Sequence, residues 1–323
     1  MACNFSIYIP PTQPDPVAVG EAALAEISEM EDLLTVYRGD SPMCQVNATA
    51  FDGPVRVDAR MFAVLARAAE LHAMTDGAFD ITAGALIKAW GFFRGPRRVP
   101  SPAEQAEALA RTGMQHVRLD PEAMTVRFDV PGLEFNLGAI GKGYAIDRAI
   151  ARIRREFNVT CALMQGGSSS VYALGAPDAD PRGWLVGIDH PYDRDLRIAT
   201  VRLRDRAMGT TGTDNQYFEY AGRRYGHVID PRKGEPADEL ASVTVLAPDA
   251  ATADALSTAL FVMGLDKARD FCHDHPEISA ILVLKPGPDA GSRAAPGVVT
   301  LNLSPLDVTI GATWRNSPVG TVT

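Results

Sequence analysis

The order of helix-like and strand-like segments along the chain is the feature that most restricts its fold. Apolar residues recur every three or four positions at 17–35 and 59–74, which predicts two amphipathic helices. Further helices are predicted at 101–112, 142–156, 251–263 and 265–274. Strand patterns lie among them and dominate 184–246, so we expect an α+β protein.

The predicted strands are short runs that alternate apolar and polar residues or are continuously apolar. They are HVRLD, TVRFD, LEFNL, CALMQGG, WLVGID, IATVRL, RRYGHVI and ASVTVLAP. In contrast, residues 37–58 are rich in Gly, Pro, Asp and Asn without a sustained period, so this segment is predicted to be a loop.

Chain length, net charge and the lack of long apolar runs restrict the expected domain organisation, partners and localisation. A chain of 323 residues forms one large domain or two intimately packed lobes. Its net charge is -9 and its basic residues are scattered, so nucleic acid is not an expected partner. No apolar run is long enough for a transmembrane segment, and the start lacks an export signal, which as written predicts a cytoplasmic protein.

The run ATADALSTALFVMG at 251–264 carries polar residues on an otherwise apolar helix. Asp254, Ser257 and Thr258 are three and four positions apart and therefore share one face. Oxygen ligands in this arrangement suit Mg²⁺, with Asp254 as the anionic ligand and Thr258 as a neutral one. Spacing alone leaves an alternative, in which Asp254 caps the helix and Thr258 bonds to the preceding turn.

The segment MGTTGTDNQYFEYAGRRYGHVIDPRKGEP at 208–236 is predicted to join a Gly/Thr-rich loop to a hairpin and then to His-Val-Ile-Asp-Pro. Small residues would let backbone amides approach a phosphate. His227 is a candidate proton acceptor or donor, and Asp230 could orient the loop or the imidazole. A purely structural histidine explains the pattern as well.

The glycine-rich segment FNLGAIGKGYAIDRA at 135–149 fits neither the P-loop nor the dinucleotide fingerprint. Its junction before a helix could still offer free amides and the Lys142 cation to a pyrophosphate. Tight helix packing would account for the glycines equally well. The segment DGAFDITAGALIKAWGF at 76–92 adds Asp80 and an aromatic cluster of Trp90, Phe92 and Phe93.

Taken in order, these segments resemble the FAD:protein FMN transferase family, also called the ApbE-like flavin transferases. The resemblance rests on MACNF, TVYRGDS, FDITAGALIKAWGF, NLGAIGKGYAID, QGGSS, TTG, HVIDPRKG and TADALSTAL. It runs from the first residues to the helix that ends near Gly264, so it covers most of the chain.

The resemblance implies roles for individual residues. Flavin contacts are implied for Met1, Tyr37, Ala78, Phe79, Asp80, Asn136, Lys142 and Ile229. A metal site is implied at Asp254, Thr258 and Ala139, the last through its backbone carbonyl, with Ser257 beside them. His227, with Asp230, is then the candidate for accepting a proton, while Lys142 and residues 210–213 would stabilise phosphate charge.

The resemblance also implies an architecture and a reaction. Such proteins are α+β, with two packed lobes in a single domain over 1–323 and FAD in the groove between the lobes. They transfer FMN from FAD to a Thr or Ser hydroxyl of an acceptor protein, release AMP and use Mg²⁺. The residues leave open a Mg²⁺-dependent FAD pyrophosphatase and a flavin-binding protein without turnover. Many members are exported or lipid-anchored, which leaves the localisation open.

Three positions depart from the family's usual pattern. Asn136 stands where Asp is common, Ser168 follows the Gly-Gly turn where Asp is frequent, and Asp214 occupies a place often held by Tyr. An amide at 136 can still accept a hydrogen bond through its carbonyl, so flavin affinity or orientation would change rather than vanish.

Overall fold

The computed structural model describes residues 3–212, 216–285 and 296–314, so the predictions for Met1, Thr213 and Asp214 lie outside it. The chain forms two compact units, each assembled from separate stretches. Unit 1 consists of Met1, Ser28–Gly141 and Asn215–Asp238, and unit 2 of Ala2–Ile27, Lys142–Asp214 and Glu239–Thr323.

Unit 2 is built on a seven-stranded sheet in which every neighbouring pair is antiparallel. Its strands, in spatial order, are β1 (Phe5–Tyr8), β5 (Ala162–Gly166), β6 (Ser170–Leu174), β9 (Arg206–Gly212), β14 (Leu240–Ala247), β15 (Ser279–Leu284) and β16 (Val298–Leu301). All eight residues of β14 are buried, so both faces of the sheet are covered there.

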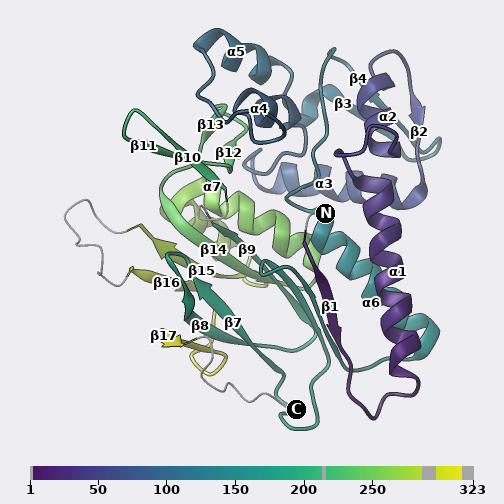
Figure 1. Ribbon diagram of the computed structural model, residues 1–323, viewed down its shortest axis with the longest axis vertical. Helices are drawn as coiled ribbons and strands as arrows, with labels where there is room; N and C mark the ends of the chain where they lie inside the picture. The colour runs from purple at the N-terminus through teal and green to yellow at the C-terminus, as the bar shows by residue number, and fades with distance from the viewer. Residues whose placement is uncertain (1–2, 213–215, 286–295, 315–323) are drawn as a thin grey trace. The chain divides into compact units, whose positions relative to one another are not determined.

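A helix covers one face of this sheet and a second sheet covers the other. The long helix α7 (Ala250–Asp274) lies along β9 and β14 (Figure 1). The second sheet contains β7 (Trp184–His190), β8 (Asp193–Leu203) and β17 (Val308–Trp314). On β9, Met208 packs into the core with β7 and β8, whereas Gly209 faces α7, because consecutive strand residues point to opposite faces.

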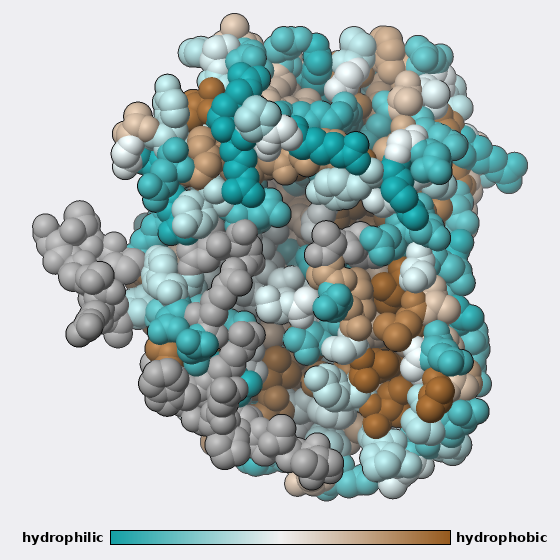
Figure 2. All heavy atoms as spheres, in the orientation of Figure 1, coloured by the Kyte–Doolittle hydropathy of each residue, from teal (hydrophilic) through white to brown (hydrophobic). Residues whose placement is uncertain are grey.

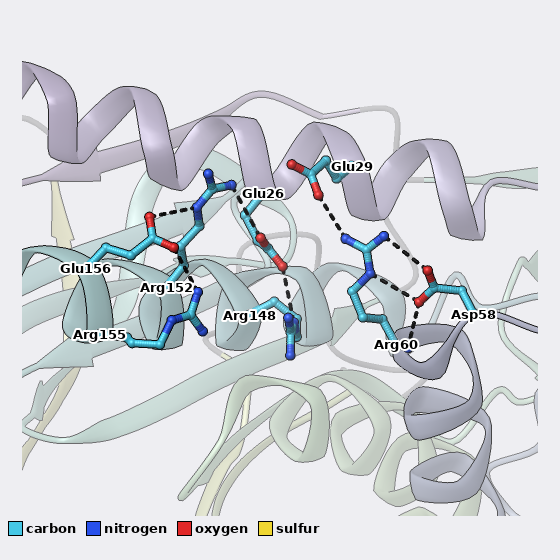
Figure 3. A network of polar contacts seen from close by, with 8 residues as sticks. All are labelled: Glu26, Glu29, Asp58, Arg60, Arg148, Arg152, Arg155 and Glu156. Carbon is cyan, nitrogen blue, oxygen red and sulfur yellow. Dashed lines mark hydrogen bonds and ion pairs between the residues drawn. The ribbon is translucent and has the colours of Figure 1, made fainter. Parts of the chain in front are cut away.

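Two further helices of the chain are tied together by charged side chains. They are α1 (Pro16–Leu34) and α6 (Gly141–Phe157). In unit 2, Glu26 of α1 is buried and accepts hydrogen bonds from Arg148 and Arg152 of α6 at 3.1 and 3.4 Å (Figure 3). In unit 1, Glu29 of α1 pairs with Arg60 at 2.8 Å.

Unit 1 consists of short helices, a small sheet and a hairpin. Its sheet has the order β2 (Val55–Arg56), β4 (Thr125–Phe128), β3 (Val117–Asp120). Its helices are α2 (Pro42–Thr49), α3 (Ala59–Met74), α4 (Gly84–Ala89), α5 (Pro102–Ala110) and the 3₁₀ turn η1 (Met114–His116). The hairpin strands are β10 (Tyr217–Tyr220) and β11 (Arg223–Gly226), followed by β12 (Ile229–Asp230) and β13 (Glu235–Pro236).

The α+β prediction is confirmed, together with most elements. The helix predicted at 59–74 has the predicted bounds, and those predicted at 251–263 and 265–274 are the two helical parts of α7, which meet at a kink. Gly264, with φ of 79°, interrupts its helical geometry where the two predictions meet.

Three local predictions are wrong. The segment 37–58 is not all loop, because Ser41 caps α2 by accepting from the Cys44 amide and Pro42 suits the first turn. LEFNL forms no strand beyond one bridge at Glu134, since its amides bond to Asn47 and Ile81. The Gly/Thr run 208–212 is not a loop but lies in β9.

No helix in the described part of the chain is long and apolar enough to cross a membrane.

Candidate active site

Asp254 is the centre of the polar groups of unit 2. It lies in the second turn of α7, with only 5% of its side chain exposed. Its carboxylate accepts from the Gly143 amide at 2.8 Å and from the Ser170 hydroxyl at 2.7 Å, and Lys142 Nζ lies 3.9 Å away. Burial raises the pKa of Asp254, and Lys142 offsets part of that effect. The carboxylate is thus buried with a single cation as its counter-charge.

Two glycines allow α7 to approach this closely. A Cβ on Gly143 of α6 would lie 2.0 Å from the Ala250 carbonyl oxygen. A Cβ on Gly209 of β9 would lie 2.4 Å from the carbonyl group of Ala253. Both distances are far below van der Waals contact, so only glycine fits. Tight packing therefore accounts for Gly143, the alternative that the sequence left open.

Hydroxyl groups line α7 next to Asp254. Thr211 of β9 lies 2.8 Å from Ser257 Oγ and 3.2 Å from Thr258 Oγ1. Ser257 donates to the Asp254 carbonyl at 2.8 Å, and Thr258 does so at 3.4 Å. Asp254, Ser257 and Thr258 therefore share one helix face, as their spacing predicts. Thr258 also bonds to the preceding turn, as in the alternative interpretation of this segment.

The capping role considered for Asp254 belongs to other carboxylates. Asp249 is the N-cap of α7 and accepts from the Thr252 amide at 2.8 Å. Asp147 of α6 accepts from the amides of Ala250 and Ala251 at 2.8 Å each. Burial raises the pKa of Asp147 to about 8, although the two amides oppose this. Asp254 is therefore not needed to cap its helix.

The backbone amides proposed as a phosphate cradle already have partners. Gly141 N donates to the Leu137 carbonyl at 2.7 Å, and Gly143 N donates to Asp254. Thr210 N donates to the Ser169 carbonyl at 2.7 Å. Among the described residues, the cation within salt-bridge distance of Asp254 is the Lys142 ammonium, whose side chain is 23% exposed.

A second buried carboxylate, that of Asp80, lies in unit 1. Thr82 donates to it through its amide at 2.7 Å and its hydroxyl at 2.6 Å. His72 Nδ1 lies 3.3 Å from Asp80 and 3.1 Å from the Phe79 carbonyl. Burial disfavours the charged imidazole, but Asp80 outweighs it, so the pKa of His72 is raised above its usual value.

The other residues of unit 1 that were predicted to contact flavin differ in exposure. Ala78, Phe79 and Ile229 are buried, so their side chains belong to the core. Tyr37 is 50% exposed and stacks on Phe93 at 5.0 Å. Asn136 accepts from the Gly138 amide at 2.9 Å through Oδ1, the contact an Asp could also make. Ala139 is half-buried in the turn before α6.

His227 lies at the base of the β10–β11 hairpin. Its Nδ1 lies 3.2 Å from the Gln216 carbonyl oxygen, and its ring meets the edge of Phe92 at 6.4 Å. A carbonyl only accepts, so Nδ1 carries the proton and Nε2 carries the lone pair. Asp230 instead binds Arg232, through Nε at 2.9 Å and Nη2 at 3.0 Å. These contacts hold the turn that follows His227.

Sequence reasoning missed Ser170 and His72, which contact the two buried carboxylates. Ser170 lies in a run of three serines, and no local pattern distinguishes it. His72 lies on the last turn of α3, eight positions before Asp80, and no local sequence pattern links the two residues. Ser168 is exposed in the turn between β5 and β6.

The site in unit 2 combines a buried carboxylate, four hydroxyls and a lysine, a set of groups suited to a hard cation and to phosphate oxygens. The sequence model of the ApbE family matches residues 1–282. The chain therefore belongs to the ApbE family.

Individual relatives agree with this assignment. The FAD:protein FMN transferase of Salmonella typhimurium is 34% identical over 79% of this chain and 73% of its own length. That of Treponema pallidum is 34% identical over 92% and 84%. The crystal structure of the ApbE protein from Thermotoga maritima is similar with a TM-score of 0.80 at 32% identity, covering 87% of this chain and 91% of the other.

Proposed function

We propose that this chain is an FAD:protein FMN transferase. In the reaction, a Thr or Ser hydroxyl oxygen of an acceptor protein forms a bond to the FMN phosphorus. The bond between that phosphorus and the bridging oxygen breaks, AMP leaves, and the hydroxyl proton is taken up by a base. Extended similarity to curated transferases of this name supports the proposal. The proposed transferase domain spans residues 1–323.

The donor set around Asp254 fits a divalent cation, and we propose Mg²⁺. A buried carboxylate with one lysine nearby gains from additional positive charge. The ligands would be Asp254, Thr258 and the Ala139 carbonyl, with Ser257 as a further hydroxyl. Bound Mg²⁺ would neutralise charge on the pyrophosphate oxygens.

The part of this site that carries the proposal is the anchoring of the Asp254 carboxylate. The Gly143 amide and the Ser170 hydroxyl fix its two oxygens from different elements. Each oxygen keeps a further lone pair for a ligand. Lys142, one position before Gly143, stabilises the phosphate charge that develops as AMP leaves.

His227 is the proposed general base. Its contact with the Gln216 carbonyl favours the neutral tautomer with the lone pair on Nε2, the atom that would accept the hydroxyl proton. Asp230 and Arg232 hold the turn that follows His227 in the chain. Flavin contacts are assigned to Met1, Tyr37, Ala78, Phe79, Asp80, Asn136, Lys142 and Ile229, where the buried positions act through their main chain.

The direct test is AMP release from FAD and Mg²⁺, with and without a peptide that carries an Asp-Gly-x-Thr acceptor site. The wild type should release AMP with the peptide and attach FMN to its threonine. His227→Gln should lower the rate about 100-fold while FAD still binds, because Gln cannot accept the proton.

His116→Gln is the matched control, since His116 is also a half-buried histidine of unit 1. It should retain wild-type turnover. Release of AMP with free FMN alone would instead identify an FAD pyrophosphatase, and bound FAD without AMP would identify a flavin-binding protein. Full turnover by His227→Gln would remove His227 from the mechanism.

A further inference from the structure

The connection between α4 and α5 is locally basic in an acidic protein. The chain carries a net charge of -9, yet between Asp80 and Glu104 it contains Lys88, Arg94, Arg97 and Arg98 and no carboxylate. Lys88 and Arg98 are neutralised by ion pairs with Glu134 and Glu104. Arg94 and Arg97 are left to define the charge of this surface.

Arg94 and Arg97 are held in place by aromatic rings and carbonyl groups. Arg94 lies 5.3 Å from the Phe93 ring centroid and donates to the Tyr37 carbonyl. Arg97 lies 5.9 Å from the Phe92 centroid and donates to the Tyr217 carbonyl at 2.6 Å. These contacts position both guanidinium groups without cancelling their charge.

Both arginines are exposed, and within the described residues neither lies in salt-bridge distance of a carboxylate. The β10–β11 hairpin continues the surface, with Arg224 3.4 Å from the centroid of the Tyr217 ring, which is 38% exposed. Figure 2 shows hydrophilic side chains mixed with apolar ones in the region of this hairpin. We call Phe92, Phe93, Arg94, Arg97, Tyr217 and Arg224 the arginine–aromatic surface.

The surface lies next to two residues with proposed roles, all within unit 1. Phe92 contacts the ring of His227, the proposed base. Phe93 stacks on Tyr37, a proposed flavin contact. Gln216, which fixes the His227 tautomer, immediately precedes Tyr217. A molecule bound on this surface would therefore reach both the base and the flavin position.

We propose that the arginine–aromatic surface binds the acceptor protein through an acidic segment beside its target hydroxyl; this rests on the proposed transferase function. Exposed arginine and tyrosine are the residue types that dominate protein interfaces. The positive charge of Arg94 and Arg97, which have no carboxylate partner among the described residues, selects a negatively charged segment and accelerates its association. FAD also carries negative charge, so its own binding is measured as a separate arm of the test.

The experiment compares two peptides that share an Asp-Gly-x-Thr site, one flanked by Asp and Glu and the other by Asn and Gln. With the wild type, kcat/KM should favour the acidic peptide and fall as salt is added. In the double variant Arg94→Glu, Arg97→Glu, kcat/KM for the acidic peptide should fall about tenfold or more, while the KM for FAD stays unchanged. Arg94→Gln, Arg97→Gln should give a smaller loss.

Arg127→Glu is the matched control, because Arg127 is an exposed arginine of unit 1 on β4. It should behave as the wild type. An equal loss for both peptides, or a raised KM for FAD, would overturn the proposal. If the wild type labels neither peptide, the transferase proposal fails; binding of the acidic peptide, measured without turnover, then still decides whether this surface recognises acidic chains.

Discussion

Asp254 in unit 2 and Asp80 in unit 1 are both buried carboxylates, with side chains 5% and 3% exposed, but they are held in different ways. The partners of Asp254 are distant in sequence, since Gly143 is 111 positions away and Ser170 is 84. Asp80 is held by Thr82 and His72, within eight positions.

The difference shows which part of the molecule each site depends on. The position of Asp254 follows from the packing of α7 against α6 and β9, where two glycines permit backbone contact. The position of Asp80 follows from a local turn after α3. Changes in packing should therefore disturb the Asp254 site strongly, whereas changes near Asp80 should have small and local effects.

The largest effect is expected for Asp254→Asn. The substitution keeps the side-chain volume but removes the anionic ligand, so AMP release should fall about a thousandfold. Stability should be nearly unchanged, because burial already disfavours the charged form. Thermal unfolding with and without Mg²⁺ measures stability and metal binding. Mg²⁺ should raise the Tm of the wild type but not that of the variant. Equal stabilisation of the variant would place the metal elsewhere.

Next in size is Gly143→Ala. The new Cβ would meet the Ala250 carbonyl oxygen at 2.0 Å, so α6 and α7 must separate, at a cost of about 3 kcal/mol. Urea unfolding measures this loss, and AMP release should fall with it. Gly53→Ala is the control, since no atom lies within 4 Å of its Cβ position. Similar stability of the two variants would argue against the close packing of α7.

Asp147 should make the stability of the protein depend on pH. Its pKa in the folded protein is about 8, against 3.8 as the ordinary value, so the folded chain retains a proton that the unfolded chain loses. Stability should therefore fall as pH rises from about 4 to about 8, by at most about 1.4 kcal/mol per pH unit.

Asp147→Asn tests this assignment, because the amide does not ionise. The slope of unfolding free energy against pH should be flatter in this variant across the same window. Identical slopes in wild type and Asp147→Asn would mean that Asp147 is ionised in the folded protein throughout.

The smallest effect is expected for His72→Asn. The raised pKa of His72 means that its protonated form, paired with Asp80, stabilises the fold below about pH 6.5, and that this contribution disappears as pH rises through the folded pKa. The variant should lose about 1 kcal/mol at pH 5.5 and less at pH 8.5. FAD affinity should weaken only slightly. If His72→Asn lost more FAD affinity than Asp254→Asn, the Asp80 site would be the more sensitive of the two.

The sequence predicts those parts of the fold that depend on local periodicity. In α1, the buried residues Val19, Ala23, Ile27 and Met30 follow the predicted helical period. LEFNL has the alternation of a strand, but its backbone finds partners in Asn47 and Ile81 instead of a neighbouring strand. α2 was missed because its start depends on the cap formed by Ser41 and Pro42 rather than on apolar spacing.

In the candidate site, too, some contacts follow from local periodicity and others depend on how distant segments pack. The shared face of Asp254, Ser257 and Thr258 follows from helical geometry, and the structure shows it. Ser170 could not be found, because its contact with Asp254 exists only once β6 pairs with β9 under α7. The Gly/Thr run in β9 has the composition of a loop, but Gly209 in it is required for the close approach to α7.

Intact-mass spectrometry of the acceptor peptide shows whether this chain moves FMN from FAD to a protein hydroxyl. After incubation with the wild type, FAD and Mg²⁺, the peptide should gain one FMN residue on its threonine, with one AMP released for each peptide labelled. Asp254→Asn should give unmodified peptide. An unmodified peptide with the wild type, while AMP and free FMN accumulate, would contradict the account.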